Sequence, residues 1–344
     1  MAGQVTLSDV AREAGVSLAT ASRALNGSAN RTVGEDLRRR VQAAAARLRY
    51  SPDGIAQAMA RGRTTSLGLV VHDIADPYFS AIAAGVAAAA DAAGLMVTLA
   101  STGLEPQREV EIVGLMERQR ARAVILAGGR PGDAAADAAV RAALESFRGV
   151  GGSVAAIGQA VLGTDTVVVG NREGADALAR ALHDRGYRRF AVLAGPEAHA
   201  TAADRREGFT AALAERGAPV PEGRLLTCAF TRDGGYEAMR RLLDDRGDVE
   251  VVFAVNDVMA VGALAAARDA GVSVPGDVSV AGFDDIETLR DVTPALTTVR
   301  LPLVRMGEEA TRLVLAPPSD EPVLVPVPGE VVLRESTPGT APSR

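Results

Sequence analysis

The chain has a single cysteine, Cys228, and only three histidines. One cysteine can form no intrachain disulfide and cannot supply a cysteine-based metal cluster. The histidines, His72, His183 and His199, are too scattered to indicate a catalytic triad or a two-histidine metal site. No P-loop, GxSxG or HExxH motif is present. The sequence therefore predicts neither an enzyme nor a protein with a metal or another cofactor.

A long apolar run is also missing. No stretch approaches the roughly 18 apolar residues that a membrane-spanning helix needs. The first residues lack the charged and then apolar pattern of a secretion signal. These absences predict a cytoplasmic protein that does not engage a membrane.

The formal net charge of −6 is unevenly spread along the 344 residues. Residues 1–63 hold ten arginines and five acidic residues, a net charge of about +5. The remainder holds 27 arginines and 38 acidic residues, a net charge of −11. A basic head can attract DNA phosphates while an acidic body stays away from them. The length itself suggests two or three domains.

The segment TLSDVAREAGVSLATASRALNG, which begins at Thr6, predicts two short helices joined by a tight turn. Thr6 can cap the first helix, with Asp9 closing a capping box. Gly15 stands where a chain leaving a helix often needs a left-handed residue. Ser17 can cap a second helix that runs to about Leu25. In this helix-turn-helix layout the second helix enters the major groove of DNA.

That second helix carries side chains suited to base edges. Arg23 can grip guanine O6 and N7, a contact worth about 1–3 kcal/mol of discrimination. Leu18 and Ala19 can meet thymine methyl groups. Ser22 and Arg49 are expected at phosphates, which set position without specifying sequence. A third helix over 35–48 carries four more arginines and an apolar stripe for the core of the head.

From Thr65 onward, short apolar runs typical of buried strands alternate with helical stretches. This alternation favours parallel sheets covered on both faces, and two such sets predict two α/β lobes. Ligands bind at the carboxyl ends of the strands in open α/β sheets, so a small molecule is expected between the lobes. The predicted strands are 67–71, 95–100, 123–127, 153–157, 166–170, 190–195, 251–255 and 278–283, and the helices include 77–93 and 107–118.

Seven motifs occur in order between Val5 and Ser336: VTLSDVAREAGVSLATASRALNG, YSP, DIADPYF, ADRREGF, FAVNDVMAVGAL, AGFDD and TPALTTVRLP. Together they resemble the LacI/GalR family of bacterial transcription regulators. The resemblance implies an N-terminal, all-α, three-helix helix-turn-helix head followed by a hinge helix. It also implies a two-lobed α/β effector domain with parallel sheets, like a periplasmic binding protein.

The predicted boundaries follow from this resemblance. The head takes residues 1–50, the hinge 51–64, the effector-binding and dimerisation domain 65–336, and a disordered tail 337–344. Lobe one takes about 65–169 and 299–320, and lobe two about 170–298 and 321–336. The chain is expected to cross between the lobes near Gly170, Thr298 and Glu321.

In the family, the hinge helix forms on DNA, pairs with its twin and pushes an apolar side chain into the minor groove. The matching side chain here is Met59, where leucine is usual. Two heads on a two-fold dimer imply a pseudo-palindromic operator. The C-terminus has no heptad repeat that would make a tetramer, so a homodimer is expected. The predicted DNA-binding residues are Thr6, Ser17, Leu18, Ala19, Thr20, Ser22, Arg23, Asn26, Arg49, Ala56 and Met59.

Polar and aromatic side chains at strand ends are the candidates for effector contact. Asp73 follows the first predicted strand, and the resemblance carries the family's effector contacts onto eight further positions. Simpler roles remain open, namely helix capping by Asp204 or Asn256 and capping or pairing by Asp285. The predicted effector-binding residues are Asp73, Tyr78, Phe79, His199, Thr201, Arg205, Phe230, Asn256 and Asp284.

Two departures from the family pattern bear on the ligand. Gly170 stands just before Asn171, where many members carry an acidic residue, so one polar contact is missing or the pocket admits a larger group. His199 stands where some relatives carry an arginine that grips a carboxylate, which argues against an acidic effector. We therefore predict a neutral sugar or a related polyol.

The sequence thus predicts a sequence-specific regulator, a repressor of sugar-uptake or catabolic genes that binds double-stranded DNA and is controlled by a small molecule. An activator, or a regulator that needs a co-repressor, remains an alternative. A transport-type or solute-binding sensor would share the body, but the basic head and the missing secretion signal argue against it. Paired aspartates, such as Asp284 and Asp285, are the only hint of an enzyme.

Overall fold

The computed structural model describes residues 5–26, 33–50, 63–103 and 105–340. The chain divides into two compact units, the head (Met1–Thr64) and the body (Thr65–Arg344). No helix within the described ranges is long and apolar enough to cross a membrane. Ala56 and Met59, predicted at the DNA interface, lie outside the described residues, as does the side chain of Asn26.

The described part of the head consists of helices α1 (Leu7–Glu13), α2 (Leu18–Asn26) and α3 (Glu35–Arg47). The predicted capping box is present, because the Thr6 side chain and the Asp9 carboxylate each accept from the other's backbone N–H. Gly15 turns the chain with φ +63°, a conformation that L side chains rarely adopt. The Ser17 hydroxyl oxygen accepts from the backbone N–H of Thr20 at 3.1 Å and caps α2. The predicted helix-turn-helix is confirmed.

Small apolar side chains hold these helices together. Each helix turns one narrow stripe inward at helical spacing, which leaves the opposite faces to solvent. The buried members are Val10, Ala11, Ala14, Ala21, Ala24, Val41, Ala44 and Ala45. Arg40 on α3 also donates to the carbonyl oxygen of Ala14 at 2.7 Å, so it closes the end of α1 and is not free for DNA.

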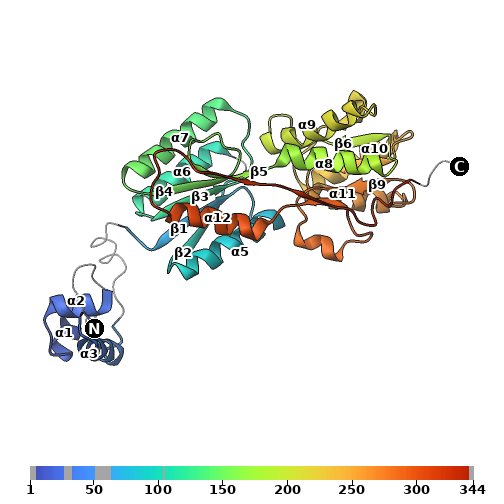
Figure 1. Ribbon diagram of the computed structural model, residues 1–344. Coiled ribbons are helices and arrows are strands. Elements are labelled where there is room, and N and C mark those ends of the chain that lie inside the picture. The colour runs from blue at the N-terminus through green and yellow to red at the C-terminus, as the bar shows by residue number, and fades with distance from the viewer. Residues whose placement is uncertain (1–4, 27–32, 51–62, 104, 341–344) are drawn as a thin grey trace. The chain divides into compact units, whose positions relative to one another are not determined.

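Lobe one of the body is built on a six-stranded parallel sheet in the order β11-β5-β4-β3-β1-β2. Its side chains alternate between two covered faces. Leu69 packs in the cluster that includes α5 and α12, whereas Val70 packs with α6 and α7 (Figure 1). The strands are β1 (Ser66–Val71), β2 (Met96–Ser101), β3 (Ala123–Ala127), β4 (Ser153–Gly158), β5 (Asp165–Val169) and β11 (Leu324–Val327). The helices are α5 (Pro77–Ala92), α6 (Pro106–Arg118), α7 (Ala134–Gly149) and α12 (Leu303–Leu315).

Lobe two has a four-stranded parallel sheet in the order β7-β6-β8-β9. Helix α8 packs on α9, and α10 packs on α11. The strands are β6 (Phe190–Leu193), β7 (Leu225–Leu226), β8 (Val251–Ala254) and β9 (Ser279–Ala281). The helices are α8 (Asn171–Asp184), α9 (Ala200–Glu215), α10 (Arg232–Asp244) and α11 (Asp257–Asp269), with short 3-10 turns at Glu222–Arg224 and Glu287–Asp291.

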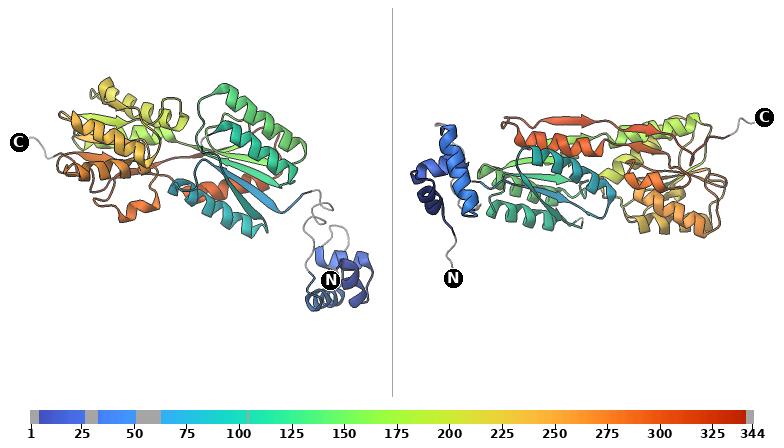
Figure 2. Two further views of the ribbon diagram at one scale, coloured as in Figure 1. Left: turned by 180° about the vertical axis from the view of Figure 1, so that it is seen from behind. Right: turned by 90° about the horizontal axis from the view of Figure 1, so that it is seen from below.

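The predicted lobe boundary near the C-terminus is wrong. We placed 321–336 in lobe two, but β11 pairs in parallel with β5 of lobe one, from Leu324 with Thr166 to Val327 with Val169. The chain returns to lobe two only after β11. There β12 (Glu330–Val332) pairs antiparallel with β10 (Thr298–Arg300), and Figure 2 shows the chain running along the body between the lobes. An edge position beside β5 satisfies backbone groups that lobe two could not.

The prediction of a disordered tail over 337–344 is wrong for its first four residues. Thr337 is fully buried, and its side-chain oxygen lies 2.6 Å from that of Thr297. The backbone N–H of Gly339 donates to the Tyr187 hydroxyl at 3.1 Å, and that of Thr340 donates to the carbonyl oxygen of Arg185 at 3.0 Å. These polar residues are ordered because lobe two supplies partners for their backbone. Residues 341–344 lie outside the described ranges.

Candidate functional site

The solvent face of α2 carries the predicted base-contacting side chains. Leu18 is 52% exposed, Ala19 is exposed, and Arg23 is partly exposed, while Ala21 and Ala24 are buried on the opposite face. Ser17 and Thr20, also predicted at DNA, share a hydrogen bond between their hydroxyl oxygens at 2.8 Å. An apolar pair beside an arginine on one exposed helix face is suited to thymine methyl groups and a guanine edge.

Other predicted DNA contacts in the head already have structural roles. The Thr6 hydroxyl donates to the Asp9 carboxylate at 2.7 Å as part of the helix cap. Arg49 is exposed and follows the end of α3 with φ +53°. Ser22 is partly exposed on α2. The structure places these residues on the head without testing whether they touch DNA.

A cavity of about 690 Å³ lies between the two lobes of the body. Lobe one contributes the chain that follows β1 and the start of α5, and lobe two contributes the starts of α9, α10 and α11 and the chain after β9. Its size is within the range of about 300–1,000 Å³ typical of small-molecule sites. All nine predicted effector-binding residues line it: Asp73, Tyr78, Phe79, His199, Thr201, Arg205, Phe230, Asn256 and Asp284.

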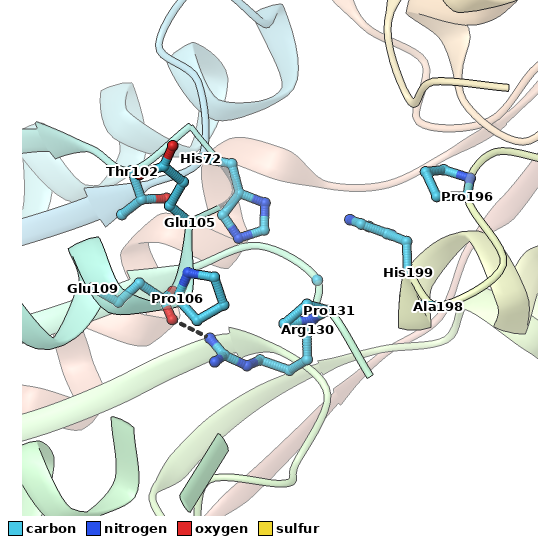
Figure 3. Close-up of a pocket in the computed structure, with 11 residues that line it drawn as sticks. His72, Thr102, Glu105, Pro106, Glu109, Arg130, Pro131, Pro196, Ala198 and His199 are labelled. Atoms are coloured by element: carbon cyan, nitrogen blue, oxygen red, sulfur yellow. Dashed lines mark hydrogen bonds and ion pairs between the residues drawn. The ribbon is translucent and has the colours of Figure 1, made fainter. Parts of the chain in front are cut away.

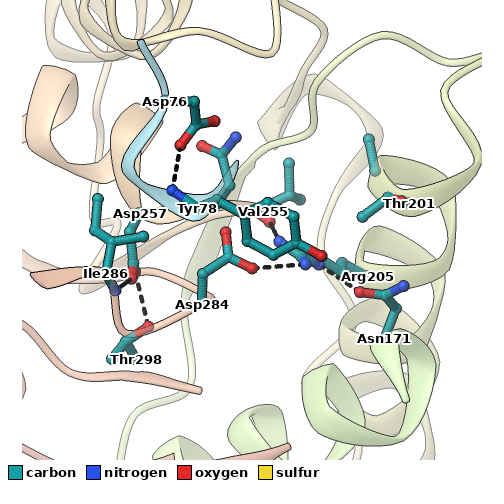
Figure 4. Close-up of polar contacts among 12 residues, drawn as sticks. Asp76, Tyr78, Asn171, Thr201, Arg205, Val255, Asp257, Asp284, Ile286 and Thr298 are labelled. Carbon is teal, nitrogen blue, oxygen red and sulfur yellow. Dashed lines mark hydrogen bonds and ion pairs between the residues drawn. The ribbon is translucent and has the colours of Figure 1, made fainter. Parts of the chain in front are cut away.

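Arg205 is the central polar group of this cavity, with a side chain only 2% exposed (Figure 4). Its Nη2 donates to Asp284 Oδ1 at 2.7 Å, and its Nε donates to Asn171 Oδ1 at 2.8 Å. Its Nη1 donates to the carbonyl oxygen of Val255 at 2.9 Å. The guanidinium also lies 3.9 Å from the centre of the Phe283 ring. These contacts fix the arginine in a single position before any ligand arrives.

Burial controls the protonation of the groups around Arg205. It raises the pKa of Asp284, and the charge and hydrogen bond of Arg205 oppose that rise. Burial likewise raises the pKa of Tyr78, with the Asp284 carboxylate adding to the effect. It also raises the pKa of Asp76, which caps α5 by accepting from the backbone N–H of Tyr78 at 2.9 Å. The cavity therefore offers fixed hydrogen-bonding groups of both kinds, a combination suited to hydroxyl groups.

Aromatic and imidazole rings form a second side of the cavity. His199 stacks on Phe230 with ring centres 4.6 Å apart and planes at 22°. His72 meets Phe79 edge-on at 5.5 Å and His199 edge-on at 6.3 Å. Phe79 is 93% buried and belongs to the core of lobe one as well as to the cavity wall. These rings can cover the C–H face of a ligand.

The simpler roles considered for three residues have different outcomes. Asn256 does cap a helix, since its Oδ1 accepts from the backbone N–H of Met259 at 2.8 Å, and it also lines the cavity. Asp204 does not cap α9, because His199 is the residue at that helix start. Asp285 forms ion pairs with Arg300 and Arg334, each at 2.7 Å.

Several cavity residues were not predicted from the sequence. His72 and Ser101 directly follow or end the parallel strands β1 and β2, so applying the strand-end rule to every strand would have found them. Asp76 belongs to the DIADPYF motif but looked like a plain helix cap. Arg232 and Asp233 begin α10, and no local signal points to them.

No group of three or more histidine, cysteine, aspartate or glutamate side chains within the described ranges is arranged to hold a metal ion. The cavity instead presents one buried arginine, carboxylates, an amide and aromatic rings. Together with the helix-turn-helix head, this body defines the class of DNA-binding regulators that carry a ligand-binding α/β domain.

Comparison with known proteins agrees with this class. Residues 6–53 match the family model of bacterial regulatory proteins, lacI family, and residues 179–337 match a periplasmic binding protein-like domain. The HTH-type transcriptional regulator GalS of Salmonella typhimurium is 36% identical over 313 residues, covering 90% of this chain and 89% of GalS. The chain belongs to the lacI family of bacterial regulatory proteins, and it is a DNA-binding transcriptional regulator with an effector-binding domain.

Two solved structures resemble the whole chain. The lac repressor dimer bound to operator and the anti-inducer ONPF has a TM-score of 0.84 at 25% identity, with 97% of this chain and 99% of that chain covered. The complex of the transcriptional regulator CelR with cellobiose has a TM-score of 0.70 at 30% identity, with 96% of this chain and 99% of that chain covered.

Proposed function

We propose that this regulator is a homodimeric repressor of sugar-uptake or catabolic genes, which binds a pseudo-palindromic operator and releases it when a neutral sugar enters the interlobe cavity. The observation that carries the proposal is the cavity itself. Arg205 is held by Asp284 and Asn171 beside the stacked rings of His199 and Phe230. Fixed polar groups next to ring faces are the usual way to bind a polyol.

The relatives support both halves of this proposal. CelR binds cellobiose, and the lac repressor binds its operator as a dimer. His199 also argues against an acidic effector, because burial lowers its pKa to about 4 and leaves the ring neutral at pH 7. We infer further that the protein acts in the cytoplasm and is not an enzyme. A co-repressor or an activator role would use the same cavity with the opposite sign or another promoter position.

Selection from genomic DNA tests the DNA-binding half. The full chain is incubated with fragmented DNA of its source at near-physiological salt, and the retained fragments are sequenced. We expect one pseudo-palindrome, which Arg23→Ala loses because a guanine contact is worth about 1–3 kcal/mol. Arg39→Ala is the matched control, since Arg39 is exposed on α3 and pairs with Asp36. Unselective binding that vanishes with salt would contradict specific recognition.

Calorimetry tests the effector half. The full chain is titrated with neutral monosaccharides and disaccharides, with uronic acids and with purines. We expect a neutral sugar to bind and to release the selected operator fragment. Tight binding of a purine or a carboxylate alone would refute the sugar proposal while leaving the DNA-binding half intact.

A further inference from the structure

A smaller cavity of about 190 Å³ adjoins the effector cavity, and we call it the side pocket. The two cavities share His72, Gly129 and His199. Beyond these, Thr102 and Arg130 of lobe one and Ala198 of lobe two line only the side pocket (Figure 3). None of these three was among the predicted site residues.

His199 presents an unused donor to the side pocket. Its Nδ1 accepts from the backbone N–H of Ala202 at 3.3 Å, so the proton of the neutral ring resides on Nε2. That Nε2 is buried and has no acceptor among the described residues. Figure 3 shows the free edge of the ring pointing across the pocket towards His72. A buried donor without an acceptor is costly, which indicates that an acceptor is supplied from elsewhere.

Arg130 presents a second unused donor, on a side chain only 5% exposed. Its Nη1 donates to Glu109 Oε2 at 2.7 Å, and its Nε donates to Asp137 Oδ1 at 2.8 Å. Its Nη2 is buried and has no acceptor within the described part of the chain. The two carboxylates fix the guanidinium and leave this one nitrogen for another group.

The charges around the side pocket select the kind of acceptor. Glu109 and Asp137 both pair with Arg130, so the two carboxylates outnumber the one cation. Glu105 adds a third carboxylate at the wall. Burial keeps His72 and His199 neutral, with pKa values of about 3 and about 4. A carboxylate or phosphate would be repelled here, whereas an uncharged hydroxyl or ether oxygen can accept from both donors.

We propose that the side pocket is a second subsite of the effector cleft, in which His199 Nε2 and Arg130 Nη2 donate to oxygens of a second ring of an uncharged oligosaccharide. The proposal rests on the sugar function proposed above and specifies its ligand class. One ring lies beside Arg205 in the large cavity, and the next extends past His199. Gly129 makes room at the passage, because a Cβ there would lie 2.8 Å from the His199 ring and 2.2 Å from Thr201 Oγ1.

Filling the side pocket provides the test. Ala198 is exposed and lines only this pocket, so Ala198→Leu narrows it without disturbing the core. The full chain is titrated by calorimetry with glucose and galactose, and with cellobiose, lactose and maltose. We expect at least one disaccharide to bind tenfold or more tightly than the monosaccharides. Ala198→Leu should remove most of that preference and leave monosaccharide affinity unchanged.

Glu197→Leu is the matched control, because Glu197 is the exposed neighbour and lines neither cavity. Equal affinity for one-ring and two-ring sugars would overturn the second subsite and leave the sugar function standing. A disaccharide preference that survives Ala198→Leu would do the same. Failure of every sugar to bind the unaltered protein would instead overturn the sugar function, and the subsite with it.

Discussion

Gln159, which follows β4 in lobe one, donates from Nε2 to the Thr201 hydroxyl oxygen on α9 of lobe two at 3.0 Å. Its Oε1 accepts from the backbone N–H of Arg130 at 3.2 Å, which orients the amide. A second bond between the lobes runs from the backbone N–H of Ala200 to the carbonyl oxygen of Arg130 at 2.8 Å. Two-lobed proteins close by hinge motion, so these bonds stabilise the arrangement of lobes seen here.

Replacing Gln159 should loosen the contact between the lobes. Gln159→Leu removes hydrogen bonds worth about 1 kcal/mol in net stability, which corresponds to about a fivefold change in a local opening equilibrium. We expect the amide of Ala200 to exchange its hydrogen about fivefold faster, because its acceptor Arg130 loses its support. Hydrogen exchange with mass spectrometry measures this over the start of α9.

Gln107→Leu is the control for that experiment, since Gln107 is exposed on the first turn of α6. It should leave exchange at α9 unchanged. Equal exchange in Gln159→Leu and the unaltered protein would show that the glutamine does not hold the lobes together.

Removing Arg205 should destabilise the body strongly. Arg205→Met leaves the Asp284 carboxylate buried without its partner, and breaking a buried pair in this way costs about 3–5 kcal/mol. Arg205→Met combined with Asp284→Asn removes the unpaired charge and should recover part of that loss. Urea unfolding followed by circular dichroism gives the free energies of unfolding.

Arg206→Met provides the comparison at the neighbouring position. Arg206 reaches only Glu207, at 3.8 Å, and a pair of this kind contributes at most about 1 kcal/mol. A loss in Arg205→Met no larger than in Arg206→Met would mean that the Arg205–Asp284 pair does not stabilise the fold.

Acid should weaken the body through His72 and His199. Burial, followed in each case by nearby positive or ring charges, lowers the pKa of His72 to about 3 and that of His199 to about 4. Unfolded histidine has a pKa of about 6.5, so below that pH the unfolded chain binds more protons than the folded one. The stability is therefore complete above about pH 6.5 and declines as pH falls towards 4. Each ring should contribute about 1 kcal/mol of loss by pH 5.5.

The difference between the unaltered protein and His72→Gln isolates one ring from the buried carboxylates, whose raised pKa values act in the opposite sense. The variant should lose about 1 kcal/mol less stability between pH 7.5 and 5.5. Histidine proton NMR supplies an independent reading, in which His72 and His199 should not titrate above pH 5. An identical pH dependence in both proteins would contradict the assignment.

The cap of α1 should matter for the head. Thr6→Ala removes the side chain that accepts from the backbone N–H of Asp9, and loss of such a cap costs about 1 kcal/mol. Hydrogen exchange along α1 should rise about fivefold. Ser8→Ala, at an exposed position of the same turn, should leave exchange unchanged. Similar exchange in both variants would show that the cap does not stabilise the helix.

Much of the fold was predictable because its signals are local. The Thr6 cap, the left-handed Gly15 and the alternating strand and helix patterns each depend on neighbours a few residues away. The predicted strand 123–127 coincides with β3, and the strand ends identified most of the polar groups that line the cavity. The resemblance then placed the remaining predicted effector residues around the same cavity.

The sequence by itself determined the class of protein, since a helix-turn-helix and two α/β repeats are written in short-range patterns. Only the tertiary structure decided how distant segments pair. It joined β11 to β5 in lobe one, and it paired Arg205 with Asp284, 79 residues apart. It also left unused donors on His199 and Arg130 at one pocket. Such contacts depend on strand register and on how the lobes close, and neither leaves a periodic signal along the chain.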